Sequence, residues 1–150
     1  MKLNKILKRK GYISIKLNKT ITNHYEVKAK INGKKGSFIL DTGASNSCID
    51  FNNANYFNLD VLASSTLASG AGATDMFTKK SLKNKLSIKK WHFFNFDLVL
   101  FDLTHVNLAL TKHNAKEIHG IIGADILQKG KAIIDYKNSK LYLKKLVFMY

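Results

Sequence analysis

The chain has 150 residues, of which 45% are hydrophobic and 23% are charged, a composition typical of one globular domain with a hydrophobic core. It contains no proline, which excludes Pro-rich linkers, and its single cysteine excludes an internal disulfide or a thiolate metal site. Its 25 basic and 10 acidic residues give a net charge of +15 that would attract anionic partners. The lysines are scattered and no RNA-binding or zinc-finger motif accompanies them, so we expect a solvated surface and no specific nucleic-acid partner.

The first ten residues, MKLNKILKRK, include five cations. No apolar stretch is long enough for a signal peptide or a membrane span, so we expect a cytoplasmic protein without a membrane span. The basic start is interpreted as a loose tail, or alternatively as the entry to the first strand. Residues 1–20 then form a basic extension and a first strand, because 12–17 alternate between apolar and polar side chains.

Residues 24–40 predict a β-hairpin. Tyr25, Val27, Ala29 and Ile31 alternate with polar residues, which is typical of a half-buried strand. Asn32-Gly33 is a strong turn signal because both residues tolerate positive φ. The returning strand, 38–40, ends directly at Asp41.

The middle of the chain is less regular. Residues 52–69 hold either a helical turn or a loop before a strand, and the segment SGAGATDMF follows with Gly70 and Gly72. Strands are expected at 82–88 and 94–103, and the polar residues 111–120 are expected to form a loop.

The C-terminal part predicts a buried strand and turn at 121–123, and then a short helix that ends at Gly130. Asp125 is expected to cap this helix, with contact to a substrate as the alternative. Two strands around Lys137-Asn138 follow. The apolar end, 146–150, either completes the barrel of its own subunit or joins a sheet between subunits. The fold class is all-β, a barrel or sandwich with one short helix after Gly123.

The sequence Asp41-Thr42-Gly43 is the candidate catalytic motif, although such a tripeptide is also a common turn. Two carboxylates about 3 Å apart share one proton, so one can activate a water while the other donates to a carbonyl oxygen. The sequence contains a single Asp-Thr-Gly. A second copy related by a twofold axis would supply the second carboxylate.

Three motifs in this order resemble those of the retropepsin-like aspartic proteases, single-lobe relatives of pepsin. They are FILDTGAS, SGAGATDM and HGIIGADIL followed by AIIDYKNSKLYL, and the resemblance covers roughly residues 22–145. It is greater to the bacterial and cellular branch than to the viral one. Ser45 and Ala124 stand where viral members carry an acidic residue and an arginine. The chain is also longer than a viral protease, mainly at the N-terminus and around 85–118.

The resemblance implies one protease domain over 21–150, with a closed retropepsin-like barrel and a homodimer that binds an extended peptide or protein substrate under two flaps. It implies an aspartic endopeptidase that needs no cofactor and no metal. The site residues follow by motif position: Asp41 is catalytic, and Thr42, Gly43 and Ala44 support it. The flap tip is Gly70, Ala71 and Gly72, and the strand packed under the catalytic loop contains Ile121, Ile122 and Gly123.

Cysteine and histidine offer no alternative chemistry of their own in this sequence. Cys48 is expected to be a buried packing residue rather than a nucleophile, and the five histidines lack metal-ligand spacing. The alternative functions are a protease-like module that binds peptides without cutting them, and nucleic-acid binding through charge alone.

Overall fold

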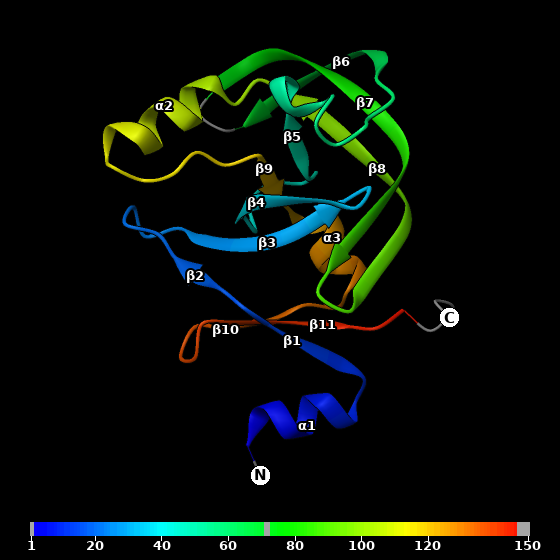
Figure 1. Ribbon diagram of the computed structural model, residues 1–150, viewed down its shortest axis with the longest axis vertical. Helices are drawn as coiled ribbons and strands as arrows, with labels where there is room; N and C mark the ends of the chain where they lie inside the picture. Colours follow the sequence, from blue (N-terminus) through cyan, green and yellow to red (C-terminus); the bar gives the residue numbers. More distant parts are fainter. Residues whose placement is uncertain (1, 71–72, 147–150) are drawn as a thin grey trace.

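The computed structural model describes residues 2–70 and 73–146. Its elements follow in chain order (Figure 1): α1 Leu3–Arg9, β1 Tyr12–Lys16, β2 Asn18–Lys19, β3 Tyr25–Ile31, β4 Lys34–Leu40, β5 Cys48–Asp50, the 3-10 helix η1 Phe51–Asn53, β6 Leu62–Gly70, β7 Ala73–Ile88, β8 Trp91–Phe101, α2 Thr104–Lys112, β9 Gly120–Ile122, α3 Ala124–Lys129, β10 Ile133–Asp135 and β11 Lys140–Lys144.

Six strands close into a barrel in the order β3-β4-β9-β5-β8-β7. A second pairing of β3, with β7, closes the ring through Lys30↔Ser87 and Ile31↔Leu86. The pairs β4–β9 and β5–β8 are parallel and the other pairs are antiparallel. The expected all-β barrel is confirmed, and its closure leaves these strands no free edge.

The predicted hairpin at Asn32-Gly33 is confirmed. β3 and β4 pair from Glu26↔Ile39 to Ile31↔Lys34, and both turn residues have positive φ, 52° for Asn32 and 83° for Gly33. The Asn32 side chain also donates to the carbonyl oxygen of Phe57 at 2.8 Å. The turn therefore sets the register that brings Asp41 to the end of β4.

A second sheet has the antiparallel order β1-β11-β10 and lies below the barrel in Figure 1, with α1 beyond it. The helix buries Leu7 and carries Lys8 and Arg9 in its last turn, where cations complement the helix dipole. The prediction of a loose basic tail was therefore wrong, because the buried Leu7 holds this segment against the fold.

The short helix after Gly123 is confirmed as α3, but α2 was not predicted. The sequence of α2 includes Thr104, Val106 and Thr111, whose β-branched side chains are poor helix formers. Tertiary contact holds the helix instead: the buried Asn107 donates to the carbonyl oxygen of Ile118 at 3.2 Å and accepts from its amide at 2.8 Å. The expected loop at 111–120 thus begins only after the last turn of α2.

Residues 52–69 contain both of the expected features, since η1 and a turn precede β6. At the other end, β10 and β11 flank the predicted turn at Lys137-Asn138. Residues 147–150, for which two roles are expected, lie outside the described residues.

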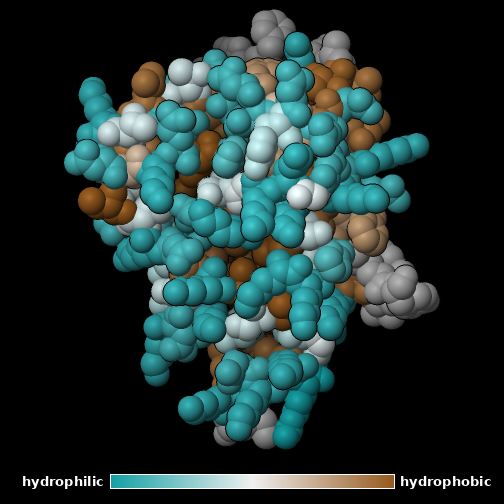
Figure 2. Space-filling model, in the orientation of Figure 1, coloured by the Kyte–Doolittle hydropathy of each residue, from teal (hydrophilic) through white to brown (hydrophobic). Residues whose placement is uncertain are grey.

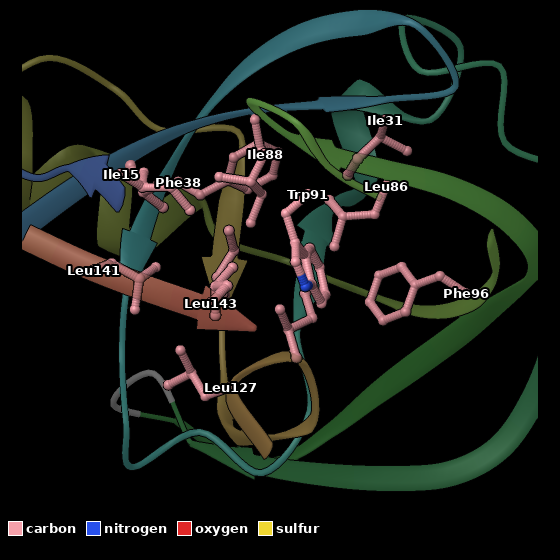
Figure 3. Close-up of a cluster of buried hydrophobic side chains, with 14 of the residues drawn as sticks. Ile15, Ile31, Phe38, Leu86, Ile88, Trp91, Phe96, Leu127, Leu141 and Leu143 are labelled. Carbon is pink, nitrogen blue, oxygen red and sulfur yellow. The ribbon is translucent and has the colours of Figure 1, made fainter. Parts of the chain in front are cut away.

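The barrel and the terminal sheet share one hydrophobic core. Figure 3 shows Trp91 between Leu86 of β7 and Leu143 of β11, with Ile88 and Leu141 in the same cluster. The indole of Trp91 is fully buried and donates to the carbonyl oxygen of Lys144 at 2.9 Å. This contact connects β8 to β11 and fixes the terminal sheet against the barrel.

The face shown in Figure 2 is covered mostly by hydrophilic side chains, as expected for the scattered lysines. Among the described residues, no helix is both long enough and apolar enough to cross a membrane.

Candidate active site

Asp41 lies at the point where β4 ends beside β9. The two strands are parallel, with Leu40 opposite Ile122, and the amide of Asp41 donates to the carbonyl oxygen of Ile122 at 2.9 Å. One carboxylate oxygen of Asp41 then accepts the amide of Gly43 at 2.9 Å. The turn fixes the carboxylate, yet Asp41 is exposed in this single chain, so one copy does not enclose it in apolar surroundings.

The residues after Asp41 form a loop that packs against the start of α3. Thr42 and Gly43 are exposed, whereas Ala44 is partly buried and its carbonyl oxygen accepts the amide of Ala124 at 2.7 Å. A Cβ atom on Gly123 would lie 2.5 Å from that same oxygen. Glycine is therefore required at 123 for the loop to approach α3 this closely.

Ile121 and Ile122 occupy β9 between β4 and β5. Both are buried, and they lie opposite Ile39 and Leu40 of β4 in the parallel ladder. This pairing places the strand 120–122 directly beside the one that delivers Asp41.

The buried Ser47 and the partly buried Asp125 form a connection that the sequence did not reveal. The Ser47 hydroxyl donates to Asp125 at 2.6 Å, and the Ser47 amide is 3.0 Å from each of the two carboxylate oxygens. The same hydroxyl accepts the amide of Gly123 at 2.8 Å. These bonds fix the far end of the loop that begins at Asp41.

The prediction that Asp125 caps the helix was wrong. The N-cap residue of α3 is Gly123, and it makes no side-chain cap. Asp125 lies in the first turn, where it accepts the amide of Ile126 at 2.8 Å in addition to the donors of Ser47. No local signal in the sequence identifies this role, because Ser47 and Asp125 lie 78 positions apart.

Cys48 follows Ser47 and is buried, as predicted for a packing residue. Burial raises the pKa of its thiol to about 12, so the thiolate needed for nucleophilic chemistry is scarce at neutral pH. The histidines give no metal site either: within the described part of the chain, no three His, Cys, Asp or Glu side chains are grouped to hold an ion.

A cavity of about 330 Å³ reaches Asp41. Its lining is mostly apolar and consists of His24, Ile39, Leu40, Asp41, Val106, Leu110, Ile118 and Ile121. Asp41 is the single acidic residue among these described lining residues. One chain therefore presents one carboxylate at the end of an apolar cavity, with α2 forming a wall that was not anticipated.

The segment expected to be a flap lies between two strands that pair as a hairpin, β6 and β7. Gly70 is the last residue of β6 and pairs with Ala73. Ala71 and Gly72, the rest of the predicted tip, lie outside the described residues.

Comparisons with known proteins agree with this geometry. The family model for aspartyl proteases matches residues 27–126. A search of curated proteins finds no match.

Among solved structures, similarity extends over most of the chain. A retropepsin-like aspartic protease from Rickettsia conorii aligns with a TM-score of 0.58 and 21% identity, over 90% of this chain and 91% of that one. The EIAV protease aligns with a TM-score of 0.57 and 20% identity, over 77% and 95% of the two chains. The retroviral protease-like domain of Ddi1 from Leishmania major aligns with a TM-score of 0.54 and 19% identity, over 81% of this chain and 88% of that one. The chain therefore belongs to the aspartyl protease family and has the retropepsin-like fold.

Proposed function

We propose that the protein is an aspartic endopeptidase whose active site forms between two copies of the chain. The observation that carries this proposal is the position of Asp41, fixed by Gly43 at the end of an apolar cavity in which it is the single acidic residue among those described. One carboxylate cannot serve as base and acid together, and a twofold axis beside Asp41 would supply the second.

The reaction proceeds on a water held between the two carboxyl groups. The ionised Asp41 takes a proton from the water, whose oxygen bonds to the scissile carbonyl carbon, while the protonated Asp41 donates to the carbonyl oxygen. Collapse of the tetrahedral intermediate breaks the C–N bond, and the amine leaves with a proton. Because one carboxyl must hold a proton and the other must not, activity is expected to be greatest at mildly acidic pH.

The other predicted site residues have supporting roles in this proposal. Thr42 bonds across the dimer and fixes the two loops, and Gly43 contacts the substrate backbone, next to Ala44. Gly70, Ala71 and Gly72 cover the substrate as the flap tip. Ile121, Ile122 and Gly123 hold the catalytic loop from below.

The test replaces Asp41 with Asn, which is nearly isosteric and retains the oxygen that accepts the Gly43 amide. Wild type, Asp41→Asn and the exposed control Asp60→Asn are incubated with a diverse peptide mixture between about pH 3.5 and 7.5, and new termini are identified by mass spectrometry. We expect cleavage by wild type and the control, and a loss of at least about 10³-fold in Asp41→Asn. Cleavage that survives in Asp41→Asn would refute the mechanism.

Analytical ultracentrifugation of the same samples tests the dimer. A chain that stays monomeric and cuts no peptide would instead support a module that binds peptides through the same cavity, because a single chain presents a single carboxylate there.

A further inference from the structure

We propose that a histidine-rimmed groove beside α2 extends the Asp41 cavity and selects substrates with an apolar residue at the cleavage site and an acidic residue two to four positions away. This preference rests on the proteolytic function proposed above. It concerns α2 and the turn at 20–24, neither of which holds the catalytic loop.

The groove is continuous with the candidate active site. A second cavity, of about 700 Å³, is lined by Ile21, Thr22, His24, His105, Val106, Ala109, Leu110 and His113. Three of these residues, His24, Val106 and Leu110, also line the cavity that reaches Asp41. A peptide held at Asp41 can therefore extend along α2 without leaving the hollow surface.

The inner part of the groove is suited to an apolar side chain. Ile39, Leu110, Ile118 and Ile121 all line the cavity at Asp41 and each is at most 8% exposed. Together with Val106 they give it an apolar floor, and a side chain buried there gains about 25 cal/mol per Å² of apolar surface removed from water.

The rim of the outer part carries three imidazoles. His24 precedes β3, while His105 and His113 lie eight positions apart, at the start and the end of α2. Eight residues of helix span about 12 Å, which equals about three to four residues of extended peptide. A substrate carboxylate can therefore meet an imidazole at several positions along the rim, so the test scans two to four residues from the cleavage site.

His24 is held in place before any ligand arrives. Its Nδ1 is 2.8 Å from the hydroxyl of Thr22, and its backbone amide donates to the hydroxyl of Thr20 at 3.1 Å. The second ring nitrogen of an imidazole so held is available to a ligand. Because His24 lines both cavities, it is expected to contribute most to the preference.

The charges around the groove favour a carboxylate. Among the described residues, no Asp, Glu, Lys or Arg lines the outer cavity. The nearest charged residues in the chain are Glu26 to His24, Asp102 to His105 and Lys112 to His113, with Asp41 at the inner end. The hydrogen bonds from Thr104 have the largest effect in lowering the pKa of Asp102, and the nearby His105 lowers it further. The negative charge of Asp102 is therefore already partly balanced.

The occupant is a peptide carboxylate rather than a nucleic acid or a metal. Phosphate backbones are bound chiefly by Lys and Arg, which do not line this groove in the described structure. The three histidines are also not grouped as metal ligands in the described part of the chain. Imidazolium groups above an apolar floor instead match a peptide that carries both an apolar and an acidic side chain.

The experiment compares matched peptides at pH 5. Each peptide has one Leu or Phe cleavage site, and each pair carries Glu or Gln at one position two, three or four residues from it, on either side. The kcat/KM ratio for Glu over Gln is measured in wild type, in His24→Gln, in His113→Gln and in the triple variant that adds His105→Gln. The control is His92→Gln, because His92 has the same hydroxyl–Nδ1 bond, to Ser87 at 2.9 Å, and lines neither cavity.

We expect a Glu/Gln ratio of about two- to fivefold in wild type and in His92→Gln at one or more positions. The ratio should fall toward one in the triple variant, with His24→Gln giving the largest single decrease. A wild-type ratio of one at every position, or a ratio that survives in the triple variant, would overturn the inference while leaving proteolysis intact.

Binding of the same peptides to Asp41→Asn, measured by fluorescence anisotropy, separates this inference from the proposed function. If wild type cuts no peptide, the catalytic proposal fails, but tighter binding of Glu peptides that depends on the three histidines would still support the groove. Equal affinity for the Glu and Gln peptides would overturn it.

Discussion

The bond between Ser47 and Asp125 allows a quantitative test of what fixes the catalytic loop. Replacing Asp125 with Ala removes the acceptor of the Ser47 amide, the Ser47 hydroxyl and the Ile126 amide. Ser47 is 2% exposed, so water does not replace the lost acceptor for its amide. Hydrogen bonds to a charged group contribute about 1.5–3 kcal/mol each.

Counting only the two donors of Ser47, the free energy of unfolding should fall by about 3–6 kcal/mol in Asp125→Ala. Asp125→Asn retains one acceptor oxygen and should lose about half as much. The matched control is Asp102→Ala. Asp102 also accepts an amide and a hydroxyl, both from Thr104, but it does so at an exposed site, where water can replace the lost acceptor and a much smaller loss of stability is expected.

Urea unfolding followed by the fluorescence of Trp91 measures these differences, since this residue is the only tryptophan and is fully buried. All variants are compared at one protein concentration, because the stability of a dimer depends on it. With a slope of about 2 kcal/mol per molar urea, Asp125→Ala should shift the midpoint by on the order of 2 M. If Asp125→Ala loses no more stability than Asp102→Ala, the reasoning about the connection between Ser47 and Asp125 is wrong.

Two further predictions concern titratable groups, the buried Cys48 and the half-buried His119. Because burial raises the pKa of the Cys48 thiol to about 12, a thiol reagent at pH 8 should label the native protein at least about 100-fold more slowly than the protein in urea; rapid native labelling would contradict this assignment. Burial, followed by the charge of Lys28, lowers the pKa of His119, which also accepts the Ser37 amide at Nδ1. As the pH falls below about 6.5, His119 binds a proton in the unfolded chain before it does so in the folded protein. The stability that comes from neutral His119 is therefore complete above about pH 6.5 and is lost as the pH falls toward the lower pKa of the folded state. Urea midpoints measured from pH 7.5 to 5 should decline less steeply in His119→Gln than in wild type or in the exposed control His92→Gln, and identical slopes would contradict the prediction.

Local signals in the sequence were sufficient for several elements. Asn32-Gly33 defines a turn through the backbone freedom of those two residues, and the alternation of residues 25–31 defines the strand beside it. The motif at Asp41-Thr42-Gly43 and the segment Gly120–Ile122 with its following helix were recognisable in the same way, because each depends on residues that are close together in the chain.

Tertiary structure decided the rest. Ser47 and Asp125 meet across 78 positions only because β9 pairs with both β4 and β5 and thereby brings the start of α3 against the catalytic loop. No property of either residue indicates that partner. The helix α2 depends in the same way on the bonds between Asn107 and Ile118, since its own β-branched residues do not favour a helix.

The sequence by itself thus determined the hairpins, the Asp41 motif and the family they indicate, because turn geometry and strand alternation are properties of neighbouring residues. Only the folded chain decided that a helix would form one wall of the Asp41 cavity, and that His24, His105 and His113 would meet along one groove. The physical reason is that such contacts depend on strand order and barrel closure, which join segments that share no local signal.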